Sequence, residues 1–382
     1  MPPVAAEAYS SSSIASARSQ RLVYGSDDAL FGHIEAKQGT KPFGSFLDAG
    51  TGVHSLRWIA TLASDDTNTP KSSSSTTTMK DFTAVTADEN MRRDCQKEVD
   101  ELGMSYLGKV VIGNWFPPNG DDTQSLSMID TDEEGKLKQY DTILADYLIG
   151  AMDGFSPYTQ DQMIHKLAKR LRPGGRLYIV GLQPIPDSFG NDRNSPQNII
   201  CEVRKVRDAC ILLAGDRCYR EYPLDWIERQ ITKTATTKTP KSATESNNNV
   251  GTGEATASHG DDVTLELLDS MKFPIMYRHS TIVKQINVGR NKLSRFPSKA
   301  MAHEMKQVLD DLEKRSKEAT DKIPGNRILL GFDYVCVLVL FKQSFLFGNV
   351  FVIVASMVFA VACRVDCECA VPGSSTNHLL ID

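Results

Sequence analysis

Short apolar runs alternate with amphipathic stripes along the first half of the chain, and this alternation limits the fold more than any other feature. The runs that read as buried strands are 44–50, 82–88, 107–115, 140–150 and 176–182. The segments that read as helices are 53–63, 89–103 and 157–171, with Pro-Gly-Gly at 173–175 closing the last one. Strands that are apolar throughout are typical of a parallel sheet covered on both faces. The pattern therefore predicts an α/β protein with a doubly wound, mostly parallel sheet.

The second half continues with longer elements. Residues 198–231 read as mostly helical, and 272–288 read as a strand or hairpin. A long amphipathic helix is expected at 298–319 and a last buried strand at 328–340.

Two stretches interrupt this pattern. Residues 64–80 and 232–262 consist mainly of Ser, Thr, Asn, Gly and Lys and contain almost no large apolar side chains. Such segments cannot bury enough surface to offset the entropy of ordering, so we expect disordered inserts there and a disordered leader at 1–20. The expected organisation is one domain at 21–340 followed by an apolar segment and tail at 341–382.

Composition restricts partners and compartment. The 382 residues carry a formal net charge of −5, and no basic face dominates, which argues against nucleic acid as a partner. The eight cysteines are scattered, which favours a reducing, cytoplasmic location over a disulfide scaffold. Cys363, Cys367 and Cys369 lie close together near the end; a metal site, palmitoylation or an incidental tail would each explain them, and we expect no metal.

Residues 345–363 carry no charge and are long enough to cross a bilayer of ~30 Å. A membrane anchor, a non-native tail and an additional buried element all remain open. If the segment is an anchor, the basic residues before it (Lys322, Arg327 and Lys342) would keep the main domain on the cytosolic face.

The first strand runs into a glycine turn that has the spacing of a nucleotide-binding loop. Gly50 and Gly52 fit the dinucleotide pattern G-x-G-x-x-G, but Ser55 stands where the third glycine belongs. Asp48 precedes the turn, and a carboxylate is a poor neighbour for a pyrophosphate. It suits a cationic ligand instead, such as S-adenosylmethionine with its sulfonium and amino groups.

Three motifs in order carry a family resemblance. "FLDAGTGVHSL" resembles motif I (D-x-G-x-G-x-G) of class I S-adenosylmethionine-dependent methyltransferases. "YDTILADYLI" resembles the fourth-strand motif of that family, and "LAKRLRPGGRLYIVG" resembles its helix-PGG-strand motif. The resemblance covers 21–183 and extends more weakly to 340. It implies a Rossmann-like sheet of seven strands, S-adenosyl-L-methionine as cofactor, and methyl transfer to an acceptor.

The resemblance also implies roles for single residues. The turn would line the methionine part of the cofactor, through Asp48, Ala49, Gly50, Thr51 and Gly52. Asp88 would bind the ribose, because Thr86 stands where the family has an acid. Asn114 and Trp115 would meet the adenine. His54, in place of the family's third glycine, would crowd or hydrogen-bond the cofactor's carboxylate.

Asp146 would contact the cofactor and act as general base, and Tyr147 would join it as a catalytic residue. Weaker candidates for the acceptor site are Asp153, Tyr158, Tyr222, Arg278 and His279. Simpler structural roles are open for several of these residues: an N-cap for Asp88, loop hydrogen bonds for Asp48, and core packing for Trp115 and Tyr147.

The expected function is transfer of a methyl group to an unidentified small molecule or protein side chain. Two alternatives stay open: an inactive methyltransferase-like binding module, and an aminopropyltransferase of the same fold, against which Thr86 counts. Ser55 disfavours a nicotinamide dehydrogenase.

Overall fold

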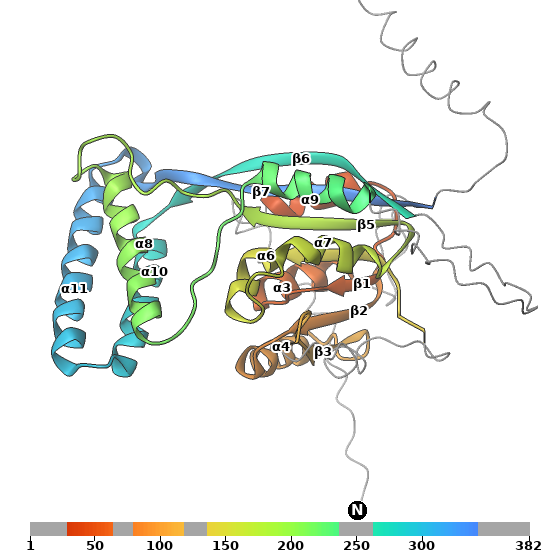
Figure 1. Ribbon diagram of the computed structural model, residues 1–382, viewed down its shortest axis with the longest axis horizontal. Coiled ribbons are helices and arrows are strands. Elements are labelled where there is room, and N and C mark those ends of the chain that lie inside the picture. Colours follow the sequence, from red (N-terminus) through yellow and green to blue (C-terminus); the bar gives the residue numbers. More distant parts are fainter. Residues whose placement is uncertain (1–28, 64–78, 118–135, 237–262, 343–382) are drawn as a thin grey trace, which may run out of the picture. The chain divides into compact units, whose positions relative to one another are not determined.

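The computed structural model describes residues 29–63, 79–117, 136–236 and 263–342, and these ranges are the basis of every structural statement below (Figure 1). All of them belong to one compact unit, 1–342. The expected leader, most of both inserts, the apolar segment 345–363 and the three clustered cysteines lie outside the described residues.

A seven-stranded sheet organises this unit. Its strands are β1 (Gly44–Asp48), β2 (Met79–Thr86), β3 (Gly108–Ile112), β4 (Tyr140–Asp146), β5 (Leu171–Leu182), β6 (Val263–Tyr277) and β7 (Ile328–Lys342). They lie side by side in the order β3-β2-β1-β4-β5-β7-β6. Strands β1 to β5 are parallel, whereas β7 runs antiparallel to both β5 and β6. The predicted Rossmann-like, mostly parallel sheet of seven strands is therefore confirmed.

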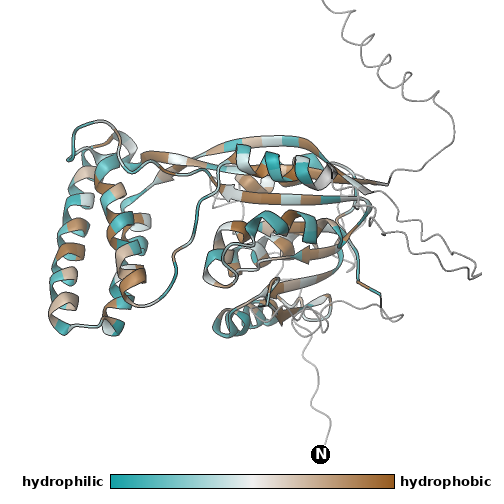
Figure 2. Ribbon diagram, viewed as in Figure 1, coloured by the Kyte–Doolittle hydropathy of each residue, from teal (hydrophilic) through white to brown (hydrophobic). Residues whose placement is uncertain are grey.

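Helices cover the sheet on both faces. On one face α2 (Ala29–Gln38), α3 (Val53–Leu62) and α4 (Glu89–Glu101) bury their apolar sides against the strands. On the other face α7 (Gln160–Ala168) and α9 (Leu224–Thr236) do the same, with the short helices α6 (Leu148–Ala151) and η1 (Met152–Gly154) at the edge. Apolar residues run along the strands, while the helices carry mixed faces (Figure 2).

Three helices form a separate core beside the sheet. They are α8 (Pro196–Leu213), α10 (His279–Lys292) and α11 (Lys299–Asp321), and they pack together where β6 ends and β7 begins (Figure 1). The short turns η2 (Leu293–Arg295) and η3 (Pro324–Asn326) connect this lobe internally and to β7.

The expectation of a strand or hairpin at 272–288 is wrong for its second half. Strand β6 ends at Tyr277, and α10 follows directly. Ile282, Ile286 and Gly289 are the buried positions of α10, and their spacing of four and three residues is that of one helix face. The β-branched residues that suggested a strand thus pack into the lobe core as a helical stripe.

Two boundaries also differ from expectation. The expected strand 140–150 stops at Asp146, because Tyr147 adopts a left-handed backbone conformation with φ 49° and begins α6. Helix α7 ends at Ala168 rather than at the Pro-Gly-Gly turn, which lies inside β5 at a break in its register with β4.

No helix within 29–63, 79–117, 136–236 and 263–342 is both long and apolar enough to cross a membrane. The segment for which an anchor was considered is not among these residues.

Candidate functional site

A cavity of about 350 Å³ lies where β1, β2, β3 and β4 end, at the edge where open α/β sheets bind ligands. Its size falls in the range of ligand pockets, ~300–1,000 Å³. Six of the residues predicted to hold a cofactor line it: Ala49, Gly50, Thr51, Asp88, Asn114 and Trp115. Most of the remaining wall is apolar and comes from Val85, Ala87, Met91, Leu148, Ala151, Met152 and Phe155, with Thr86, Gly113 and Ser156.

Asp48 lies beneath the turn rather than in the cavity wall. Its side chain is fully buried, and Oδ2 accepts a hydrogen bond of 2.6 Å from the Ser55 hydroxyl. Oδ1 has no hydrogen-bond partner among the described residues, and neither does the nearby hydroxyl of Thr51. Burial raises the pKa of Asp48 to about 6, although the hydrogen bond from the Ser55 hydroxyl opposes the rise. A buried carboxylate oxygen without a donor is a position where a ligand's N–H group would fit.

The turn itself is open on one side. A Cβ on Gly52 would meet no atom within 4 Å, whereas a Cβ on Gly50 would lie 2.9 Å from Leu148 Cδ1. A side chain at position 50 would thus press on Leu148 of α6, while Gly52 leaves free space at the start of α3. Ser55, at the position of the missing dinucleotide glycine, accepts a hydrogen bond of 3.2 Å from the Gly52 amide.

His54 follows the turn as an exposed residue of α3. Its side chain is exposed, and its ring lies 5.1 Å from the ring of Phe31 on α2. His54 is also absent from the cavity wall. Whether His54 crowds or hydrogen-bonds a cofactor's carboxylate stays a prediction.

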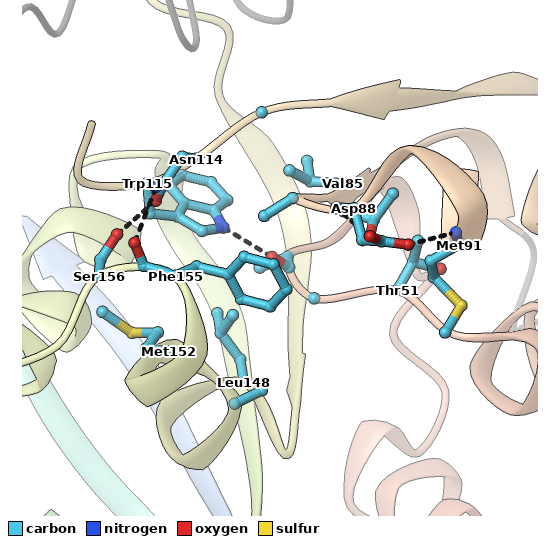
Figure 3. Close-up of a pocket in the computed structure, with 16 residues that line it drawn as sticks. Thr51, Val85, Asp88, Met91, Asn114, Trp115, Leu148, Met152, Phe155 and Ser156 are labelled. Atoms are coloured by element: carbon cyan, nitrogen blue, oxygen red, sulfur yellow. Dashed lines mark hydrogen bonds between the residues drawn. The ribbon is translucent and has the colours of Figure 1, made fainter. Parts of the chain in front are cut away.

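At the end of β2, Asp88 is the N-cap of α4. Its Oδ1 accepts a hydrogen bond of 2.8 Å from the Met91 amide, and its own amide donates to the Thr86 hydroxyl at 3.3 Å (Figure 3). Asp88 therefore does act as an N-cap, which is the structural role considered for it. Because Asp88 also lines the cavity, capping orients its carboxylate without removing it from the site.

Trp115 joins the end of β3 to the glycine turn. Its indole is buried, and Nε1 donates a hydrogen bond of 2.6 Å to the Ala49 carbonyl (Figure 3). Trp115 is thus both a core residue and a cavity wall.

Asn114 holds the opposite wall in place. Its Nδ2 donates to the Phe155 carbonyl at 3.3 Å, and its Oδ1 lies 2.5 Å from the Ser156 hydroxyl and accepts from the Phe116 amide at 3.1 Å. The Phe155 ring, 47% exposed, reaches into the middle of the labelled side chains (Figure 3). The amide of Asn114 is thus engaged by the protein, so its direct role at an adenine stays a prediction.

Asp146 and Tyr147 end β4 and begin α6, but neither lines the cavity. Burial raises the pKa of Asp146 to about 8, with the nearby carboxylates of Asp48 and Asp333 adding to the rise. Burial also raises the pKa of Tyr147, whose hydroxyl donates a hydrogen bond to Asp333. The two predicted catalytic residues therefore lie together with the carboxyl groups of Asp48 and Asp333, next to the cavity.

None of the weaker acceptor candidates is among the residues that line this cavity. Asp153 is buried in an ion pair with Arg217 at 3.2 Å, which anchors the segment after α6. Tyr158 is 82% exposed, and His279 lies in the helical lobe beside Ser316.

Several residues at the site were not predicted. The cavity residues Met91, Leu148, Met152 and Phe155 have ordinary core-like sequence contexts, so none of them was singled out from the sequence. Asp333 was missed because it lies in a strand whose direction the sequence does not give. In the described part of the chain, no group of His, Cys, Asp and Glu is arranged to hold a metal ion.

No family model and no curated protein matches the chain. Solved structures with a similar fold include the YcgJ protein of Bacillus subtilis (TM-score 0.40, 13% identity, covering 78% of this chain and 92% of that one). Another is a putative sarcosine dimethylglycine methyltransferase from Galdieria sulphuraria (TM-score 0.38, 12% identity, 83% and 85% covered). A third is a SAM-dependent methyltransferase from Geobacter sulfurreducens in complex with S-adenosyl-L-homocysteine (TM-score 0.36, 11% identity, 79% and 86% covered). Likenesses this distant do not assign an activity or a substrate.

Proposed function

We propose that the protein is an S-adenosylmethionine-dependent methyltransferase. The observation that carries the proposal is the buried, partly unpartnered carboxylate of Asp48 under an open glycine turn, next to an apolar cavity at the carboxyl edge of the sheet. Together these features offer a hydrogen-bond acceptor for the amino group of a ligand, free space for that ligand at the turn, and an apolar wall for an adenine ring.

The residues present fit this cofactor in three parts. Trp115 and the apolar cavity residues would hold the adenine, and Asp88 would bind the ribose hydroxyls. Asp48 and the turn amides would hold the methionine end, where Asp48 Oδ1 lacks a donor. The cofactor supplies an electrophilic methyl group on a sulfonium, and the protein has to align an acceptor with it.

Asp146 is suited to handle the acceptor's proton. With a pKa of about 8 it carries a proton near neutral pH when no cation is near. A positively charged ligand beside it favours the carboxylate form and lowers this pKa. Ligand binding would thus convert Asp146 from an acid into a base at the moment a base is needed.

Neither alternative function gains support from the site. An aminopropyltransferase would be expected to carry an acid at the position of Thr86, and Thr86 instead accepts a hydrogen bond from the Asp88 amide. The other alternative, an inactive methyltransferase-like binding module, has to be tested by measurement.

Calorimetry on the full-length protein tests the proposal. We expect S-adenosylmethionine and S-adenosylhomocysteine to bind and NADH, as the control, not to bind. Absence of heat with both adenosyl ligands would reject the proposal. Binding of both without methylation of any acceptor in a broad screen would favour the inactive module.

A further inference from the structure

The part of the cavity wall that follows β4 is held in place by two kinds of contact. Five cavity residues belong to it: Leu148, Ala151, Met152, Phe155 and Ser156 (Figure 3). Leu148 and Met152 are buried in the core beneath α7 and α9, whereas Phe155 is 47% exposed. Apolar packing therefore fixes the beginning of this wall, and its end depends on polar contacts.

Asp153 lies in the middle of this wall but does not line the cavity. Its side chain is buried, and its carboxylate is bound by Arg217, with Nε 3.2 Å from Oδ2 and Nη2 3.4 Å from Oδ1. Arg217 Nε also donates a hydrogen bond of 2.8 Å to the Asp153 carbonyl. A single guanidinium thus binds both the backbone and the side chain of Asp153, which fixes its position and its orientation.

The residues next to Arg217 contact the same wall. The Arg220 amide donates to the Gly150 carbonyl at 3.2 Å, and Arg220 Nε lies 3.7 Å from Asp153 Oδ2. The Tyr219 ring packs so closely on Gly150 that a Cβ there would lie 2.2 Å from Tyr219 Cζ. This short segment before α9 therefore lies along α6 and η1 at several consecutive points.

The helical lobe holds the same segment from its other end. Asp216, directly before Arg217, accepts hydrogen bonds from Lys292 Nζ at 2.8 Å and from Arg295 at 2.7 Å. Arg295 also donates to the Ala214 carbonyl at 2.8 Å. Arg217 thus reaches Asp153 from a backbone that the lobe has already fixed, as is typical of residues that support a binding site.

We propose that Arg217 is a positioning residue of the cofactor cavity. It acts through Asp153, which it binds from outside the cavity. In this way it keeps Met152, Phe155 and Ser156 at the distance from the glycine turn that an adenosyl ligand requires. This inference rests on the proposed function, because the ligand whose affinity it sets is S-adenosylmethionine. It gives Asp153 a role in the site other than the contact with the acceptor that was predicted for it.

The physical reason is the burial of the Asp153 carboxylate. Without Arg217, the remaining cation near it would be Arg220, whose Nε is 3.7 Å away and whose side chain is 62% exposed. A buried charge that has lost its partner is strongly unfavourable. The wall would therefore shift until water reaches Asp153, and the cavity on its other side would lose its shape.

The test measures the affinity of full-length protein for S-adenosylhomocysteine by calorimetry. We expect Arg217→Ala to bind it about five- to thirtyfold more weakly than the wild type. Arg217→Lys keeps the charge but cannot bind the carbonyl and the carboxylate together, so it should lose only about two- to fivefold. Arg229→Ala, which removes an exposed ion pair on α9, is the matched control and should leave the affinity unchanged.

Two further measurements distinguish positioning from general stability. Amide hydrogen exchange at 152–156 should become faster in Arg217→Ala, while exchange in β4 should not change. Adding Asp153→Asn to Arg217→Ala removes the buried charge that has lost its cation. The double variant should therefore bind S-adenosylhomocysteine at least about threefold more tightly than Arg217→Ala alone, although less tightly than the wild type.

The outcomes separate the two proposals. If S-adenosylhomocysteine does not bind the wild-type protein, the proposed function fails and this inference fails with it. If the wild type and Arg217→Ala bind it alike, the positioning role alone is rejected. Faster exchange throughout the sheet, or a double variant no better than Arg217→Ala, would assign Arg217 to general stability and also reject the role. If Arg217→Ala does not fold, Arg217→Lys decides, and an affinity equal to that of the wild type rejects the role.

Discussion

At the scale of single residues, Asp48 is a buried carboxylate whose hydrogen bonds are only partly made within the described residues. Its neighbours are a serine hydroxyl, a threonine hydroxyl and a backbone amide, all of them neutral. One oxygen of the carboxylate is left without a donor while the side chain is fully buried. Burying such an atom costs about 1–3 kcal/mol, which a ligand's N–H group would recover.

Replacing Asp48 by asparagine tests this directly. The change keeps the shape of the side chain and removes its charge, so S-adenosylmethionine should lose a charge-assisted hydrogen bond of about 1.5–3 kcal/mol. We expect calorimetry to show roughly ten- to hundredfold weaker binding. Ser55→Ala, which removes the 2.6 Å hydrogen bond to Asp48 without removing the carboxylate, should have a smaller effect. Equal affinities for wild type and Asp48→Asn would show that Asp48 only supports the turn.

At the scale of elements, the sequence predicted well where structure is decided locally. The glycine turn, its strand and its helix are contiguous, so the strand–turn–helix around Asp48 and Gly50 could be predicted from spacing, while the ligand roles of these two residues stay predictions. The same local patterns did not predict α10, because Ile282 and Ile286 suit a strand and a helix alike until the lobe core selects the helical stripe.

Residues brought together by distant contacts could not be predicted. Asp333 reaches the site only because β7 runs antiparallel to β5, which places an early residue of β7 at the carboxyl edge of the sheet. Phe155 borders the cavity because Asn114 and Ser156 hold its segment, a contact between the ends of β3 and α6. Neither the order of the strands nor such a hydrogen bond between distant side chains can be predicted from the local periodicity of the sequence.

The wall formed by α6, η1 and the following residues should depend on Asn114. Replacing it by alanine removes the bonds to Phe155 and Ser156, so the segment 152–156 should open more often. Hydrogen exchange of these amides should become faster, and S-adenosylhomocysteine should bind about three- to tenfold more weakly. Asn90→Ala on the exposed side of α4 is the matched control. Unchanged exchange at 152–156 would mean that packing alone holds the wall.

At the scale of the whole molecule, folding brings three aspartates from β1, β4 and β7 to the same edge of the sheet. The pKa of Asp146 is raised to about 8, and the pKa values of Asp48 and Asp333 are raised to about 6, with burial as the main cause each time. All three exceed the ~3.9 of an aspartate in an unfolded chain. The folded protein therefore holds protons that the unfolded chain releases between about pH 4 and pH 8.

This difference fixes the direction of the pH dependence of stability. Where the folded state binds more protons than the unfolded state, the free energy of unfolding falls as pH rises. The contribution of the three aspartates is thus fully present below about pH 4, decreases as pH passes 6, and is lost above 8. Asp216 acts in the opposite sense, but its pKa is lowered to about 2 by Arg295 and Lys292, so its effect falls below this window.

Asp146→Asn removes the group with the highest of the three pKa values and should change this profile most. Urea unfolding of the ligand-free protein from pH 5 to pH 8.5 should show the wild type losing stability steadily and the variant losing less. The advantage of the variant should therefore grow with pH and reach about 1–3 kcal/mol at pH 8.5. Asp225→Asn, whose carboxyl has a lowered pKa beside Arg229, should give a curve parallel to the wild type over the same range. If the Asp146→Asn curve is parallel as well, Asp146 is ionised in the free protein, and it cannot change from acid to base when a cation binds.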